Sequence, residues 1–248
     1  IVATRGGTVT PAQIEIREGS PIDHLALCGP DTRDAVARMA ELTGVTAELR
    51  DPEPDQYYWS ATIPLGQSRF LEILGPNPEF RGFNPFIETV RQFDGLRPVF
   101  WYVGTRDFEA FRVASKRAGA PVERIETVTL DRDGERFDYT RGILGPGFKS
   151  ARPCVIEWRE RPPSVTADSQ LRLTALRLAD PDAASLRETF AALGIEQTVE
   201  QGPASLAVDL ETPEGPITFE GPGLEFRGVG ALVQMARLYV RHRLSRTS

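Results

Sequence analysis

Residues 21–44 read PIDHLALCGPDTRDAVARMAELTG and decide the fold, because an apolar strand leads directly into an amphipathic helix. Asp31 or Thr32 offers an N-cap for this helix, and Gly44 offers the glycine that ends it. Side chains two apart on a strand share a face, so His24 points away from the face that its apolar neighbours present to the helix. The segment therefore predicts a sheet with a helix on one face and a histidine on the other.

The same pattern recurs in the middle of the chain. Residues 98–119, PVFWYVGTRDFEAFRVASKRAG, again combine an apolar strand with an amphipathic helix. Three strand-like runs follow each copy, and the last of them are RFLEILGP at 69–76 and CVIEW at 154–158. Repeats of this length identify the structural unit before any fold is assigned. Both copies predict a βαβββ module, in which one strand and one helix precede three strands.

A third and weaker copy occupies residues 170–221, where a strand, a helix and three strands again follow one another. Thr218 stands where the other copies carry Glu, so this copy is expected to lack a ligand. The pattern predicts an α+β fold, with tandem βαβββ modules and a third βαβββ-like unit. We expect the third unit to complete the sheet or to form a contact in a homodimer.

The predicted organisation follows these copies along the chain. It comprises an N-terminal arm at 1–20, paired modules at 21–160 (21–76 and 98–160, joined by a linker at 77–97), and the third unit with a C-terminal helix at 165–248.

The composition is that of an ordinary soluble protein, with 40% hydrophobic and 26% charged residues among 248. A net charge of −6 argues against a nucleic-acid partner, because phosphate contacts need a basic surface. No apolar run reaches the ~20 residues that span a bilayer, so we expect no membrane span and a cytoplasmic location. Cys28 and Cys154 lie in predicted strands and are expected to be reduced thiols. The sequence leaves open whether a segment precedes Ile1.

Aligning the two modules by their helices places His24 opposite Phe100 and Glu72 opposite Glu157. Strand alternation turns all four side chains away from the helices. The same alternation turns the other residues near the end of the second module towards its helix: Ile156 and Trp158. One histidine and two carboxylates are therefore predicted to converge on a shared concave face.

At these residues the chain resembles the glyoxalase-like branch of the vicinal oxygen chelate superfamily, which includes glyoxalases, bleomycin resistance proteins and dioxygenases. The resemblance is carried by DHLALCGPD with its helix, by FLEILGP and by CVIEW, and it covers residues 22–160. It implies that the tandem βαβββ modules form a cupped mixed sheet. It also implies a divalent metal ion in the cup, held by His and Glu from the first and last strands of each module. By position, the implied ligands are His24, Glu72 and Glu157, whereas Phe100 replaces the fourth.

One imidazole and two carboxylates suit a divalent ion such as Zn, Fe, Mn or Ni, and the sequence does not select among them. The resemblance implies a metal-dependent enzyme of lyase, isomerase or dioxygenase type that acts on a small oxygen-bearing substrate. No catalytic base is identified. The expected substrate pocket has walls that include several strand residues: Phe100, Tyr102, Tyr139 and Arg141.

Two alternatives remain open at this point. Buried acids can be neutralised by arginine instead of a metal ion, here by Arg141 or Arg159, which would give a metal-free pocket that binds or sequesters a small molecule. Phe100 in place of a ligand favours this alternative. The remaining alternative is a structural or regulatory module.

Overall fold

The structure is a computed structural model, and it describes residues 4–5, 22–49, 56–132, 135–159 and 169–226. Most of the predicted N-terminal arm and the predicted C-terminal helix at 230–248 lie outside these residues. Among the described residues, no helix is both long enough and apolar enough to cross a membrane.

Two βαβββ modules are present, as the sequence predicts. The first contains β2 (Ile22–Cys28), α1 (Thr32–Thr43), β3 (Glu48–Leu49), β4 (Tyr58–Gly66) and β5 (Arg69–Pro76). The second contains β6 (Arg97–Gly104), α3 (Phe108–Arg117), β7 (Val122–Arg132), β8 (Glu135–Leu144) and β10 (Cys154–Trp158). The predicted signals at α1 are confirmed, because the Asp31 side chain accepts two backbone N–H groups and Gly44 is left-handed at φ 75°.

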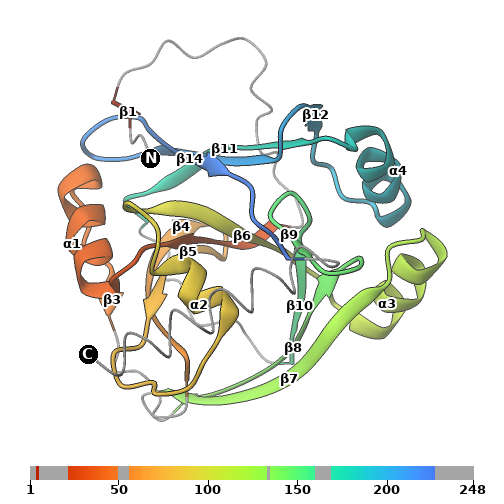
Figure 1. Ribbon diagram of the computed structural model, residues 1–248, viewed down its shortest axis with the longest axis horizontal. Helices are drawn as coiled ribbons and strands as arrows, with labels where there is room; N and C mark the ends of the chain where they lie inside the picture. Colours follow the sequence, from red (N-terminus) through yellow and green to blue (C-terminus); the bar gives the residue numbers. More distant parts are fainter. Residues whose placement is uncertain (1–3, 6–21, 50–55, 133–134, 160–168, 227–248) are drawn as a thin grey trace.

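The paired modules form one eight-stranded sheet with the order β3-β4-β5-β2-β6-β10-β8-β7. Within each module the first strand runs parallel to the last, as β2 with β5 and β6 with β10. The modules join in the middle of the sheet, where β2 and β6 are antiparallel. Figure 1 shows the sheet bending strongly, with β7 and β8 sweeping around one side. The linker contributes α2 (Pro85–Val90), which Asn84 caps.

The third unit has the predicted succession of elements but a different strand order. It contains β11 (Arg172–Asp180), α4 (Ala183–Leu193), β12 (Val199–Gln201), β13 (Ser205–Glu211) and β14 (Ile217–Pro222). Its order is β1-β14-β13-β11-β12, with β1 (Thr4–Arg5) at the edge. Here the first strand lies between β13 and β12, whereas in the paired modules it lies beside the last strand. The unit therefore forms a separate five-stranded sheet and does not extend the eight-stranded one.

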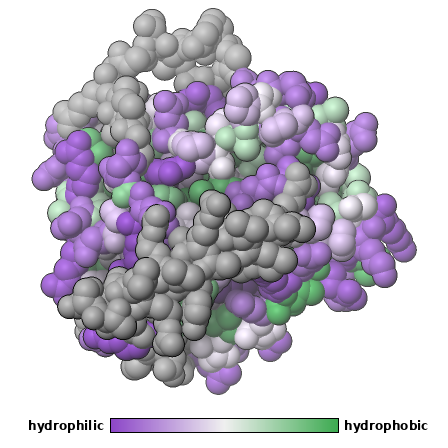
Figure 2. Space-filling model, in the orientation of Figure 1, coloured by the Kyte–Doolittle hydropathy of each residue, from purple (hydrophilic) through white to green (hydrophobic). Residues whose placement is uncertain are grey.

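This second sheet covers the helix-bearing face of the first. Figure 1 shows β11 and β14 crossing β4 and β6, with α1 on one side and α3 and α4 on the other. Apolar side chains from both sheets and from α4 form a single cluster that includes Leu25, Trp101, Leu176 and Phe190. The face towards the viewer in Figure 2 is mainly hydrophilic, with small apolar areas. Burial of one shared core therefore holds the two layers together.

A buried ion pair adds a second link between the layers. Lys149 lies in β9 (Phe148–Lys149), which pairs with β15 (Glu225–Phe226). Its ammonium nitrogen is 3.3 Å from a carboxylate oxygen of Asp180, and the two side chains are 8% and 2% exposed. Asp180 also accepts the backbone N–H of Asp182 at the start of α4. A buried pair of this kind restricts how the layers can be placed, because separating the charges is costly.

We predict that Phe190→Ala destabilises the whole molecule in one step. Phe190 is 1% exposed, and its ring lies 5.7 Å from that of Trp101 between centroids, so the substitution leaves a cavity at the layer interface. The expected loss is about 3–5 kcal/mol of unfolding free energy, measured by urea denaturation with fluorescence and circular dichroism. Val113→Ala, at a side chain that is 39% exposed, is the control and should change stability by less than about 0.5 kcal/mol. Two separate transitions would contradict a shared core.

Candidate functional site

The concave face of the eight-stranded sheet encloses a cavity of about 260 Å³. Seven aromatic side chains from the two modules line it: Tyr57, Tyr58 and Phe70 from the first, and Phe100, Tyr102, Tyr139 and Trp158 from the second. Phe86 of α2 and Phe148 of β9 extend this wall, and each has its ring within 5.0 Å of Phe100 between centroids. A mainly apolar cavity with a few polar groups is the usual form of a small-molecule site.

His24 is held in one orientation at the wall of this cavity. Its ring stacks between Phe70 and Tyr102, at centroid distances of 4.4 and 3.8 Å and interplanar angles of 10° and 17°. Its Nδ1 lies 2.5 Å from Oδ1 of Asp23, and Oδ2 of Asp23 accepts a hydrogen bond from Nε1 of Trp158 at 3.1 Å. Only 5% of His24 is exposed. Packing and hydrogen bonding therefore fix the plane of the imidazole ring.

A β-bulge makes the contact between Asp23 and His24 possible. In the pairing of β2 with β6, Ile22 lies opposite Val103 and Leu25 lies opposite Trp101. Asp23 and His24 thus lie opposite a single residue of β6, Tyr102. As a result, Ile22 and Leu25 both point into the apolar core although they are three residues apart. In a regular strand neighbouring side chains point to opposite faces, whereas a bulge redirects one of them.

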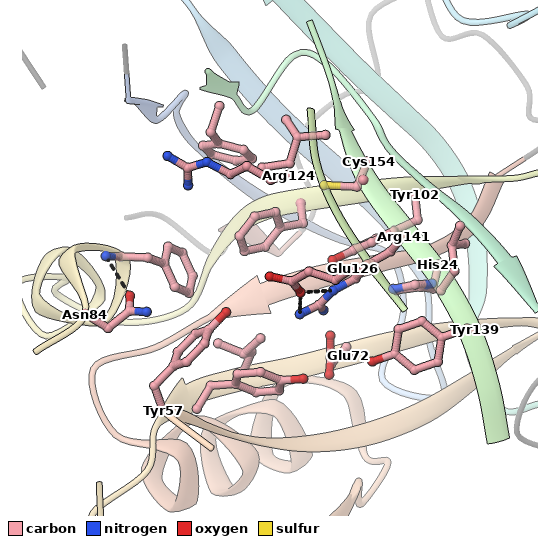
Figure 3. Close-up of a pocket in the computed structure, with 18 of the residues that line it drawn as sticks. His24, Tyr57, Glu72, Asn84, Tyr102, Arg124, Glu126, Tyr139, Arg141 and Cys154 are labelled. Atoms are coloured by element: carbon pink, nitrogen blue, oxygen red, sulfur yellow. Dashed lines mark hydrogen bonds and ion pairs between the residues drawn. The ribbon is translucent and has the colours of Figure 1, made fainter. Parts of the chain in front are cut away.

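Arg141 and Glu126 form a second polar group at the cavity. They are directly opposite each other on β8 and β7, so they share a face. Nε and Nη2 of Arg141 donate to one carboxylate oxygen of Glu126 at 3.1 and 3.0 Å. Arg141 is 23% exposed and Glu126 is 56% exposed, which places the arginine inside and the glutamate at the rim. Figure 3 shows Arg141, His24, Tyr139 and Glu72 pointing towards the same space.

Burial keeps the hydroxyl and thiol groups of this wall protonated. Burial raises the pKa of both Tyr58 and Tyr102, and the carboxylate of Glu72 raises each further. Burial also raises the pKa of Cys154 to about 12, although Arg141 opposes the shift. These groups are consequently neutral hydrogen-bond donors near neutral pH, and Cys154 is not a thiolate nucleophile.

Two of the three predicted metal ligands line the cavity, and the third does not. His24 and Glu72 lie where they were expected, as do all four predicted wall residues. Glu157 pairs across β10 and β8 with Thr140, whose neighbours on β8 line the cavity, so Glu157 and Thr140 face the other side of the sheet. Ile156 and Trp158 line the cavity instead, contrary to the prediction. The predicted strand register was wrong by one residue, which exchanges the two faces of a strand.

The strand pairing shows what replaces the missing ligands. His24 pairs with Phe70, two residues before Glu72. In the second module Tyr102 pairs with Cys154, two residues before Ile156. Tyr102 and Ile156 therefore occupy the positions that correspond to His24 and Glu72.

These residues do not fit a resident metal ion. No three His, Cys, Asp or Glu side chains converge anywhere in the part of the chain that the structure describes. Nδ1 of His24 is already engaged by Asp23, and the counterparts of His24 and Glu72 are a tyrosine and an isoleucine. A catalytic zinc site ordinarily has three protein ligands. The metal centre predicted from His24, Glu72 and Glu157 is therefore not assembled.

The sequence-based reasoning missed Asp23 and Trp158, which hold His24 from one side. A signal for Asp23 was present, because Ile22 and Leu25 are both apolar at an odd spacing that a regular strand does not give. No comparable signal marked Trp158, since the wrong register of β10 turned it towards the helix.

The geometry defines a protein built on paired βαβββ modules around a cup-shaped cavity. The model of the glyoxalase-like domain family matches residues 22–194, which is more than half of the chain. The chain belongs to the glyoxalase-like domain family, within the vicinal oxygen chelate superfamily that its sequence resembles. Comparison with curated proteins found no match.

Solved structures with the same fold are distant in sequence. A mutant form of 4-hydroxymandelate synthase from Streptomyces coelicolor is 16% identical, with 88% of this chain and 75% of that chain covered and a TM-score of 0.50. A hypothetical protein from Staphylococcus aureus is 11% identical, with 84% and 92% covered and a TM-score of 0.53. At these identities the likeness shows the fold alone.

We predict that Glu157→Gln leaves the affinity for added Zn²⁺ or Mn²⁺ unchanged, because this side chain faces away from the cavity. Isothermal titration of protein prepared without a metal-affinity column would measure it, with Glu72→Gln as the comparison at a cavity-facing acid. Loss of a true ligand should weaken binding by well over about 10-fold, given the strength of metal–ligand bonds. Weaker metal binding in Glu157→Gln would contradict this prediction and would support the strand register that was predicted from the sequence.

We also predict that both cysteines are unreactive in the folded protein. Burial raises the pKa of Cys28 and of Cys154, so at pH 7 to 8 the thiolate that attacks a disulfide reagent is scarce in the folded state. Folded protein should release almost no thionitrobenzoate from Ellman's reagent, and protein in guanidinium chloride should release two equivalents, one for each cysteine. Rapid reaction of the folded protein would show that the cavity wall is open.

Proposed function

We propose that this protein binds a small aromatic molecule with oxygen-bearing substituents in the cup, and that it does so without a resident metal ion. The observation that carries the proposal is the aromatic wall, to which both modules contribute. Flat apolar side chains favour flat ligands, because stacked and edge-to-face ring contacts add to the burial of apolar surface. The cavity of about 260 Å³ is small for a ligand site and suits a single ring with short substituents.

The polar groups at the wall indicate which substituents the ligand carries. The guanidinium of Arg141 is permanently charged, and its present partner, Glu126, lies at the exposed rim. A ligand carboxylate or phenolate can take the place of Glu126 at little cost, because an exposed ion pair is weak. The protonated hydroxyls of Tyr58 and Tyr102 add neutral donors for ligand oxygens. The ligand is thus expected to turn an oxygen anion towards Arg141.

A metal-dependent lyase, isomerase or dioxygenase is the weaker alternative. Membership of the family supports a ligand-binding cup, but the three-residue ligand set on which the metal depended is not assembled among the described residues. Two acids at the cup are instead balanced within the protein, Glu126 by Arg141 and Asp23 by contacts with His24 and Trp158. This arrangement supports the metal-free alternative that the sequence left open.

Benzoate and cyclohexanecarboxylate provide a matched test, since they carry the same charge on rings of the same size. In buffer with EDTA, benzoate should bind more tightly, as measured by chemical-shift changes and by quenching of tryptophan fluorescence. Arg141→Met should weaken benzoate binding by about 10-fold or more, because a charged hydrogen bond is lost. Arg136→Met is the control, at an exposed arginine on the same strand. Equal binding of the two acids, or binding that EDTA abolishes, would contradict the proposal.

A further inference from the structure

We propose that His24 is a general base that removes a proton from the bound molecule, and that Asp23 is its positioning residue. The inference rests on the proposed function, because it requires a ligand in the cup. It goes further by giving the cup a chemical step and by naming the atom, Nε2 of His24, that accepts the proton.

The first argument is the tautomer of the imidazole. Oδ2 of Asp23 accepts from the indole of Trp158, which can only donate, and Oδ1 lies 2.5 Å from Nδ1 of His24. An ionised carboxylate has only acceptors, so Nδ1 must carry the proton. In a neutral imidazole the other nitrogen then has a free lone pair. Asp23 therefore keeps Nε2 in the form that can accept a proton.

The second argument is the direction of Nε2. His24 lines the cavity, and within the described residues its one hydrogen-bonded partner is Asp23, through Nδ1. Figure 3 shows the imidazole directed into the space that Glu72, Tyr139 and Arg141 also face. A histidine kept only for packing would be expected to use both nitrogens inside the protein, because a buried polar atom without a partner is costly. Nε2 is instead left for whatever occupies the cavity.

The third argument is the precision with which the ring is held. The bulge at residues 23–24 brings Asp23 to the imidazole edge, while Phe70 and Tyr102 clamp its two faces. Bulges beside functional sites commonly redirect a side chain in this way. A base is effective only when its lone pair meets the substrate proton with little freedom left, so immobilisation of the ring serves catalysis directly.

The chemistry that fits is proton removal from carbon next to a carbonyl group. The C–H bond breaks, its proton moves to Nε2, and its electron pair shifts so that negative charge develops on the carbonyl oxygen. Asp23 stabilises the imidazolium, and Arg141 or a tyrosine hydroxyl stabilises the enolate oxygen. Return of the proton from Nε2 to another carbon of a conjugated enolate, with the electron pair moving from the oxygen to re-form the carbonyl group, completes an isomerisation, and no oxidant or reductant is needed. The substrate class is an aryl-substituted carbonyl compound with an acidic C–H bond.

5-Nitrobenzisoxazole is a suitable probe, because it is a flat aromatic molecule that reports on any positioned base. Removal of its ring proton forms a nitrile as the N–O bond breaks, and the coloured cyanonitrophenolate is followed by absorbance. His24→Phe retains a ring between Phe70 and Tyr102 but removes the base, and should lower kcat by about 100-fold or more. Asp23→Asn should lower kcat with KM unchanged, and Asp23→Glu, which keeps the carboxylate, should retain part of the rate. If Asp23 had a purely structural role, this pattern of kcat and KM would not be expected.

A second measurement needs no turnover. The chain contains two histidines, so His242→Gln leaves His24 as the sole imidazole. Nitrogen-15 spectra of the neutral imidazole should show a protonated Nδ1 and an unprotonated Nε2, and Asp23→Asn should change that pattern. A proton on Nε2 in the otherwise unchanged protein would overturn the inference.

The outcomes separate this inference from the function on which it rests. If the probe competes with benzoate but the unsubstituted protein turns it over no faster than His24→Phe does, the proposed binding function stands and the assignment of His24 as the base fails. If Glu72→Gln loses the activity while His24→Phe keeps it, the base is Glu72 and the inference is wrong. If neither aromatic molecule binds, the proposed function fails and this inference fails with it.

Discussion

The antiparallel pairing of β2 with β6 is the contact on which the rest of the structure depends. It is the seam between the two modules, so it sets the distance between the walls of the cup. On the convex side it brings Leu25 and Trp101 together beneath the second sheet. On the concave side its bulge turns Asp23 and His24 into contact. One irregularity in strand pairing thus serves the core and the candidate site together, because the two lie on opposite faces of the same strands.

The cup also illustrates how a protein can bury acids without a metal ion. A buried carboxylate is tolerated when its oxygens accept hydrogen bonds, and both oxygens of Asp23 do so. Glu126 meets the fixed charge of Arg141 at the rim, where water still reaches it. Tyr102 and Ile156 stand where further ligands would have stood, and they extend the apolar wall instead. The site has the shape of a metal-binding cup but the donor set of a hydrogen-bonding pocket.

Much of the fold could be predicted from the sequence, and the reasons for the failures are physical. The apolar periodicity of α1 and its end signals, Asp31 and Gly44, are local properties of the sequence. The modules could therefore be predicted from the sequence alone. CVIEW at 154–158 has apolar residues on both faces, because α3 contacts this strand and the cavity wall occupies its concave side, so alternation could not set its register. The strand order of the third unit depends on pairing between segments that are far apart in sequence. The contact of Trp158 with Asp23 is also long-range, so no local sequence pattern could predict either feature.

The covering layer bears on function as well as on stability. A general base has to stay within about 0.5 Å of its position. His24 lies on a strand whose other face packs into the core that the two layers share. Here Ile22 and Leu25 are locked into the core shared with the second sheet. Trp101, across from Leu25, is in turn fixed by Phe190 of the third unit. The third unit supplies no residue to the cavity wall among the described residues, yet its packing immobilises the strand that carries the base.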